Sequence, residues 1–219
     1  MDILKDGIAL QKAWEGFKAK KYPDGNGYSI GYGTHIDTAA EQYLLNATLT
    51  EMQGETLLLN DNRKQFIPAI QKYIKVSLTQ NQLHGLLDLL YNVGPQCLFI
   101  NGKTTGLCNA INSRDTNLIS QKFRSYNKVR KNGIVKTNAY QTKRRNADLQ
   151  MFLYGKIMKP DDTLINPSSL PGVEIVNSDS PLSTIQWVLG TLLVLGSGFL
   201  AYKQGVFKNF SLKKLFSRK

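Results

Sequence analysis

The segment WEGFKAKKYPDGNGYSIGYGTH, residues 14–35, decides the fold. Apolar side chains leading into it recur at the spacing of one helix face: Ile3, Leu10, Trp14 and Phe17. This spacing predicts an amphipathic helix over about 3–16. Residues 23–27, PDGNG, have the composition of a tight turn, and residues 28–33 alternate large and small side chains as a strand does. The segment therefore predicts a helix, a turn and a strand that meet near its middle.

Glu15 falls at the flank of the apolar helix face, and Gly16 predicts that the helix ends there. Partial burial and the negative end of the helix dipole both favour the uncharged carboxyl, so we expect a raised pKa at Glu15. For a single Glu in isolation, a salt-bridged surface residue is the simpler interpretation. Asp24 in the turn and Ser29 in the strand favour a catalytic interpretation of Glu15 instead. Glycoside hydrolysis uses a protonated carboxyl, an ionised carboxylate and a group that positions water, and these three residues could supply them.

The same segment resembles the catalytic segment of the phage-type lysozymes, glycoside hydrolase family 24. That family has a Glu, eight intervening residues, an Asp, and five more before a Thr in a TIGYGH-like strand. Glu15 and Asp24 keep the first spacing, whereas Ser29 follows after only four residues and an extra Thr34 precedes His35. Residues 79–94, 123–129 and 142–155 resemble the family's central helix and its two closing stretches.

The resemblance implies a role for each residue of the segment. Glu15 would protonate the glycosidic oxygen, Asp24 would stabilise the positively charged sugar or help activate water, and Ser29 would hold that water. The family also implies inversion at the anomeric carbon. Four further residues are candidates for substrate binding, with core or surface packing as an equal alternative for each: Tyr32, Thr34, Ile36 and Asn92.

The chain divides into four parts. Residues 1–155 are expected to form an α+β, mostly helical lysozyme-like domain with a small N-terminal β-hairpin region, and residues 156–181 a Pro-rich linker. Residues 182–202 are expected to form a single C-terminal transmembrane helix and residues 203–219 a basic tail. Within the domain, strands are expected near 20–36, and helices near 38–60, 62–73, 79–92, 105–112, 115–127 and 137–154.

Residues 182–202, LSTIQWVLGTLLVLGSGFLAY, contain no charged side chain and would span ~32 Å as a helix, enough to cross a bilayer. A buried hairpin of the domain is the weaker alternative. The tail could contact anionic lipid or nucleic acid, or could simply be a solvated flank. The positive-inside rule places it on the cytoplasmic face, and hence residues 1–181 outside, although the N-terminus does not resemble a secretory signal.

The formal net charge of the chain is +12, and residues 1–159 taken alone have a formal charge of +10. Such a domain attracts polyanions, which include nucleic acid, acidic lipid and peptidoglycan. Cys97 and Cys108 match no zinc spacing and are best interpreted as buried thiols, with a disulfide as the alternative. His35 and His84 have no apparent third ligand, and there is no phosphate-binding loop. We therefore expect no cofactor and no metal ion.

These observations together predict a muramidase that cleaves the β-1,4 bond between N-acetylmuramic acid and N-acetylglucosamine. The membrane segment favours a phage lytic protein that acts when the phage enters or lyses its host. It would reside in the internal membrane of a lipid-containing virion or in the host inner membrane. The alternatives are a lytic transglycosylase and a non-catalytic virion membrane protein that contacts glycan or DNA.

Overall fold

The computed structural model describes residues 5–131 and 133–165 of the 219-residue chain. The N-terminal helix consists of a 3-10 turn, η1 (Lys5–Ile8), followed by α1 (Ala9–Glu15). Leu10 and Trp14 bury one face of α1, as the apolar spacing predicts, and pack against residues near the C-terminal end of the described chain. The helix ends at Glu15 because Gly16 takes a positive φ of 69°.

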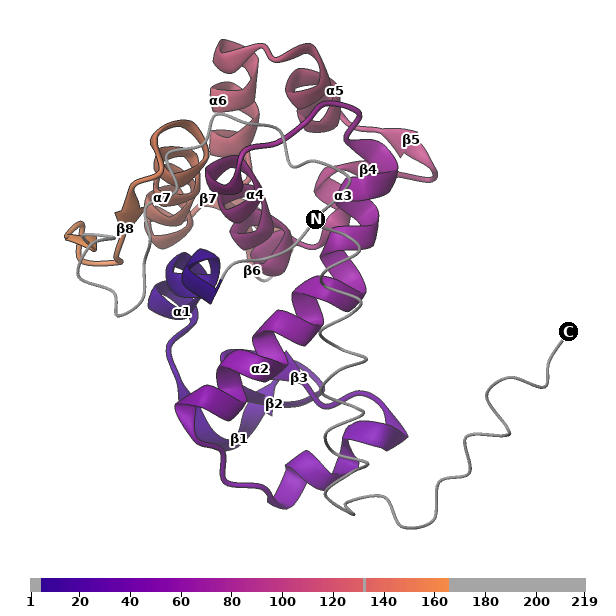
Figure 1. Ribbon diagram of the computed structural model, residues 1–219, viewed down its shortest axis with the longest axis vertical. Coiled ribbons are helices and arrows are strands. Elements are labelled where there is room, and N and C mark those ends of the chain that lie inside the picture. The colour runs from indigo at the N-terminus through magenta and orange to yellow at the C-terminus, as the bar shows by residue number, and fades with distance from the viewer. Residues whose placement is uncertain (1–4, 132, 166–219) are drawn as a thin grey trace, which may run out of the picture. The chain divides into compact units, whose positions relative to one another are not determined.

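A small lobe follows, visible in Figure 1 as the lower part of the described chain. Its antiparallel sheet has the order β1-β2-β3, and the 3-10 helix η2 covers one side. The bounds are β1 (Lys18–Asp24), β2 (Gly27–Gly31), β3 (Thr34–His35) and η2 (Ala39–Asn46). Its core is formed by Ile30, Ile36, Leu44 and Leu49. The predicted strand region is therefore confirmed, whereas residues 39–46 form a 3-10 helix of their own.

A long helical run connects the small lobe to the rest of the domain (Figure 1). It comprises α2 (Glu51–Asp61), a π-helical turn η3 (Asn62–Phe66) and α3 (Ile67–Tyr73). We predicted one helix over 38–60, which was wrong about its start. Thr50 begins a new helix because its side chain accepts a hydrogen bond from the backbone N–H of Gln53.

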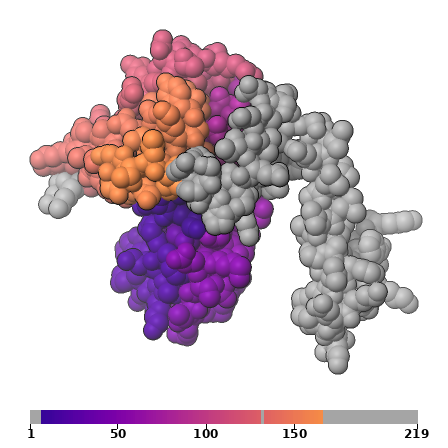
Figure 2. All heavy atoms as spheres, turned by 60° about the vertical axis from the view of Figure 1, so that its left-hand side comes forward, coloured from indigo at the N-terminus to yellow at the C-terminus, as the bar shows by residue number. Residues whose placement is uncertain are grey.

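The helical lobe is built around α4 (Gln80–Val93), whose residues 83–90 are all buried. Three further helices surround it: α5 (Gly106–Ser113), α6 (Thr116–Ser125) and α7 (Ala139–Tyr154). These four helices lie close to their predicted positions. Figure 2 shows the indigo to purple part of the chain, which contains the small lobe, directly below the pink and orange part of the helical lobe and in contact with it.

Three two-stranded hairpins were not predicted. They are β4 (Phe99–Ile100) with β5 (Lys103–Thr104), β6 (Lys128–Lys131) with β7 (Ile134–Thr137), and β8 (Ile157–Met158) with β9 (Leu164–Ile165). The last hairpin packs on the domain, because Ile157 is buried and the Met158 carbonyl accepts a 2.9 Å hydrogen bond from the Trp14 indole. The folded part of the chain thus continues beyond residue 155, where we placed the start of the linker.

The remaining predictions for the chain's organisation concern its C-terminal part. No helix within the described ranges, 5–131 and 133–165, has the length and apolar character needed to cross a membrane. The predicted transmembrane segment 182–202 and the tail 203–219 lie outside the described residues. In the domain, Cys97 and Cys108 are both buried free thiols, as the preferred interpretation had it.

Candidate active site

Glu15, the last residue of α1, lies where the helix meets the small lobe. Its side chain is 21% exposed, so the carboxyl is largely desolvated yet reachable from outside. Burial raises the pKa of Glu15 above its ordinary value; the Arg144 guanidinium acts against this, and the carboxylates of Asp88 and Asp24 reinforce it. The predicted direction of the pKa shift is therefore confirmed, with desolvation as its main cause.

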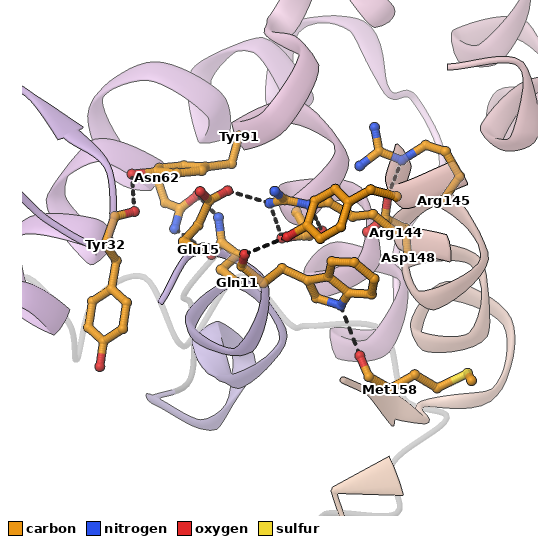
Figure 3. A network of polar contacts seen from close by, with 12 residues as sticks. Gln11, Glu15, Tyr32, Asn62, Tyr91, Arg144, Arg145, Asp148 and Met158 are labelled. Atoms are coloured by element: carbon orange, nitrogen blue, oxygen red, sulfur yellow. Dashed lines mark hydrogen bonds and ion pairs between the residues drawn. The ribbon is translucent and has the colours of Figure 1, made fainter. Parts of the chain in front are cut away.

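Arg144 of α7 holds the Glu15 carboxyl in place. Its Nη2 atom lies 2.5 Å from Glu15 Oε1, and Figure 3 shows the guanidinium between Glu15 and the interior of the helical lobe. The same guanidinium donates two hydrogen bonds to Asp88 of α4, at 3.0 Å and 2.9 Å. Arg144 is not among the candidate site residues of the sequence analysis, so its pairing with Glu15 was missed. Its neighbour Arg145 pairs with Asp148, three residues further along the same helix, at 2.7 Å.

The second carboxylate and the hydroxyl come from the small sheet. The hairpin register brings the end of β1 beside the start of β2, and Ser29 Oγ donates a 2.8 Å hydrogen bond to Asp24 Oδ2. The Nε2 atom of His35 lies 3.4 Å from the same oxygen. Asp24 remains 44% exposed, while Ser29 is buried. Asp24 is close enough to Glu15 to raise its pKa, so the structure brings all three candidate catalytic residues into one region.

Two tyrosines near Glu15 were also absent from our candidates. Tyr91 of α4 donates a 2.9 Å hydrogen bond to the Tyr32 carbonyl, and its pKa is raised by burial and by the carboxylates of Asp61 and Glu15. Tyr22 of β1 has its pKa raised by burial, then by Asp24 and Glu15. Tyr22 lies two residues from Asp24 and so on the same strand face, a signal that could have identified it.

The four candidates for substrate binding occupy different surroundings. The Tyr32 side chain is buried, packs on Phe17 with ring centroids 5.4 Å apart, and points away from Glu15 (Figure 3). Thr34 is buried and donates a 2.6 Å hydrogen bond to Asp61 Oδ2. Ile36 is part of the small-lobe core, and Asn92 is half-buried on α4. Of these, Tyr32 borders the site through its carbonyl; a substrate-binding role for all four stays a prediction.

Comparison with known proteins agrees with this geometry. The family described as phage lysozyme matches residues 12–148, which contain Glu15, Asp24, Ser29 and Arg144. The chain is 31% identical to the endolysin of Bacillus phage PZA over 131 residues, 58% of this chain and 47% of that endolysin, so it spans about half the length of that relative. It is 30% identical to the endolysin of Acyrthosiphon pisum secondary endosymbiont phage 1 over 154 residues, 69% of this chain and 98% of that one.

A solved structure shows the same fold. The endolysin from Escherichia coli phage FAHEc1 superimposes with a TM-score of 0.61 at 28% identity, covering 71% of this chain and 95% of that chain. The lysozyme-like fold expected from residues 14–35 is thus confirmed. Since the matched residues make up more than half of the sequence and include the whole candidate site, the chain belongs to the phage lysozyme family.

Proposed function

We propose that the protein is a peptidoglycan hydrolase, a muramidase that cleaves the β-1,4 bond between N-acetylmuramic acid and N-acetylglucosamine. The observation that carries the proposal is the pair of unlike carboxyls at the site. Glu15 is desolvated with a raised pKa, whereas Asp24 is 44% exposed and bonded to Ser29. Two carboxyls in such different environments are suited to one acid and one base or charge-stabilising role. The relatives' names, all endolysins, support the same chemistry.

In the proposed reaction, protonated Glu15 donates its proton to the glycosidic oxygen as the bond to the anomeric carbon breaks. Arg144 fixes one carboxyl oxygen, which leaves the other free to face the sugar. Asp24, ionised, stabilises the developing positive charge on the sugar or accepts a proton from the attacking water. Ser29 keeps the Asp24 carboxylate oriented for this role and helps to hold the water.

The direct test is turbidity loss of purified cell walls with wild type and with Glu15→Gln. The variant keeps the side-chain shape but cannot donate an acid proton, so we expect the rate to fall by at least about 100-fold. Glu51→Gln, at the exposed start of α2, is the matched control and should retain activity. Equal activity of Glu15→Gln and wild type would remove Glu15 from the acid role.

A lytic transglycosylase is the nearest alternative, since it also needs a proton donor but uses no attacking water. The Asp24–Ser29 pair favours hydrolysis because it offers a carboxylate and a hydroxyl for holding water. Mass spectrometry of the released muropeptides distinguishes the two reactions. We expect reducing ends, and anhydro ends would show transglycosylation instead.

A non-catalytic protein that contacts glycan or DNA through its basic charge is the second alternative. It predicts salt-sensitive binding to DNA without cleavage of cell walls. We expect wall cleavage that depends on Glu15, which a purely binding protein would not show.

We further propose that residues 182–202 anchor the protein in a membrane, either the internal membrane of a virion or the host inner membrane. The proposal rests on the uncharged sequence of this segment and the basic residues after it. Wild type should stay in the membrane fraction after alkaline carbonate extraction. Replacing Leu193 and Leu195 together by Arg should release it, because each charge at the segment's centre costs about 2.5–3.5 kcal/mol. Release of wild type under the same conditions would contradict the anchor.

A further inference from the structure

A chain of charged side chains runs from Glu15 into the interior of the helical lobe. Its members are Glu15, Arg144, Asp88, Asp148 and Arg145. Arg144 contacts Glu15 on one side and holds Asp88 with two hydrogen bonds on the other. Arg145 pairs with Asp148 at 2.7 Å, one turn further along α7 (Figure 3). Behind Glu15, all of these side chains are 2% exposed or less.

The charges of this chain do not balance when every group is ionised. Three carboxylates and two guanidiniums give a net charge of −1 in a region that is almost closed to water. An uncompensated buried charge is costly, and proteins usually remove it by binding or releasing a proton. Arginine keeps its proton, so the network gains stability by holding one proton among its three carboxyls.

The geometry favours two of these carboxyls as the holders. Arg144 holds Asp88 with two hydrogen bonds, and Asp148 lies one turn beyond Arg144 on the same helix. Both carboxyl oxygens of Asp148 are buried and accept no hydrogen bond among the described residues, so a bond between the two neighbouring carboxyls requires one of them to be protonated. Burial and the neighbouring Asp88 raise the pKa of Asp148 well above its usual range. Burial acts in the same direction on Asp88, but the two guanidiniums and the hydrogen bonds from Arg144 and Asp148 together outweigh it and lower the pKa of that carboxyl.

The other titratable groups around the network stay uncharged near neutral pH. Burial raises the pKa of Tyr22, Tyr91 and Tyr140, which face Glu15 from β1, α4 and α7. Burial also raises the pKa of Cys97, beside Arg145, to about 12. Asp24 is the remaining carboxylate that faces Glu15, and it is open to solvent on the other side of the site.

We propose that Asp88 and Asp148 share one proton, and that this buried pair acts through Arg144 to fix the charge that Glu15 experiences. The two aspartates are positioning residues, since neither has been placed in contact with substrate. With the proton between them, the pair carries −1 and balances one guanidinium, while the other guanidinium balances Glu15 once Glu15 has given up its own proton. Glu15 then takes up and releases its own proton without competition from a neighbouring acid. The inference depends on the proposed function only for the use to which Glu15 puts its proton.

Asp148→Asn is the decisive variant. Asn carries no charge and can donate an N–H to Asp88 in place of the shared proton. If the pair already holds one proton, the titration midpoint of the Glu15 carboxyl, followed by carbon NMR and assigned with Glu15→Gln, should coincide with that of wild type. If both aspartates are ionised in wild type, the substitution removes a negative charge and the midpoint moves to lower pH. That shift would overturn the proposal.

Asp88→Asn tests the other half of the proposal. It leaves Asp148 to pair with Arg145, and Arg144 then faces Glu15 without its second counter-charge. The Glu15 midpoint should fall by about one pH unit, which lowers wall cleavage on the alkaline side about tenfold. An unchanged midpoint in folded Asp88→Asn would contradict the role of the pair. Asp162→Asn removes an exposed carboxylate that pairs with Lys143 of the same helix and should change neither midpoint nor cleavage.

Infrared spectra keep the proposal testable if Asp88→Asn does not fold. Because Glu15 can itself hold a proton, the spectra are recorded in Glu15→Gln. At neutral pH this variant should show the C=O band of a protonated carboxyl, and the band should be missing when Asp148→Asn is added. Its persistence in the double variant would place the proton elsewhere. Both spectroscopic measurements are independent of wall cleavage. An inactive wild type with these titration results would refute the proposed function and leave the shared proton standing.

Discussion

The Ser29 hydroxyl donates a 2.8 Å hydrogen bond to Asp24 Oδ2, across the turn that joins β1 to β2. This bond ties the orientation of an exposed carboxylate to a buried residue of the sheet. Asp24 therefore has a defined direction at the site even though nearly half of its side chain is exposed to solvent.

The first prediction follows from this bond. Ser29→Ala should lower the rate of wall cleavage by about 100-fold. Without the hydroxyl, the Asp24 carboxylate and the attacking water move from the positions that the reaction requires. Ser29→Thr keeps the hydroxyl and should lose much less. Cleavage rates of both variants, with melting temperatures to verify the fold, provide the measurement. Equal losses in the two variants would show that packing at this position, and not the hydroxyl, is what matters.

The second prediction concerns Gly33, which has a φ of +97°. A Cβ there would lie 3.2 Å from the Tyr91 hydroxyl and 3.6 Å from Glu15 Oε2. Gly33→Ala should therefore cost about 1–2 kcal/mol in the free energy of unfolding, through its backbone conformation, and should also reduce cleavage by crowding the acid. Gly25→Ala is the control, since its φ of +58° is also positive but its Cβ would meet open space. It should lose stability and retain activity.

Much of the site was predictable because its parts are local in sequence. Glu15 was expected at the end of a helix, and Gly16 ends α1 there. Asp24 and Ser29 are five residues apart on one hairpin, so turn composition and strand alternation were sufficient to bring them together. The lysozyme-like fold followed from the same stretch.

Arg144 and Asp88 were not predictable by these means. Arg144 lies 129 residues from Glu15 along the chain. The apolar spacing that predicts its helix does not indicate which residue its guanidinium will contact. Neither the 3.6-residue period of α7 nor that of α4 indicates which helices will cross or at what height. Only the packing of α4 against α7 places the two side chains beside α1.

The β6–β7 hairpin was missed for a different reason. All residues of β7 are exposed, so the alternation that normally reveals a strand is absent. The Asn-Gly sequence at residues 132–133 is a hairpin signal that could have indicated it. Similarly, Thr50 followed three residues later by Gln53 was a capping-box signal for the start of α2.

The third prediction tests the α4–α7 crossing. A Cβ on Gly85 would lie 2.6 Å from the Asp148 carbonyl oxygen and 2.7 Å from the Phe152 backbone nitrogen. Backbone atoms cannot rotate aside, so Gly85→Ala must separate the helices and should cost about 1–3 kcal/mol in the free energy of unfolding. Gly27→Ala, where a Cβ meets nothing within 4 Å, should be nearly neutral. Urea unfolding of both variants measures this, and similar midpoints would show that the helices can adjust.

The last prediction concerns the stability of the fold in acid. His84 lies on α4 against Gly7, and its Nε2 atom is buried with no hydrogen-bond partner among the described residues. Burial lowers the pKa of His84 from 6.5 to about 4, so the folded state holds the imidazole neutral where the unfolded chain protonates it. The contribution of the neutral His84 ring to the free energy of unfolding is fully present above pH 6.5 and is lost as the pH falls through 4. The loss amounts to about 3 kcal/mol.

Replacing the imidazole removes this dependence. In His84→Leu, the free energy of unfolding should fall less between pH 6.5 and 4 than in wild type, and the difference between the two curves should approach that 3 kcal/mol. His35→Gln serves as the control because His35 is half-exposed beside Asp24 on the small sheet. Its curve over this range should stay much closer to that of wild type. Parallel curves for His84→Leu and wild type would mean that the buried ring does not control acid stability, and that the carboxyls of the domain do.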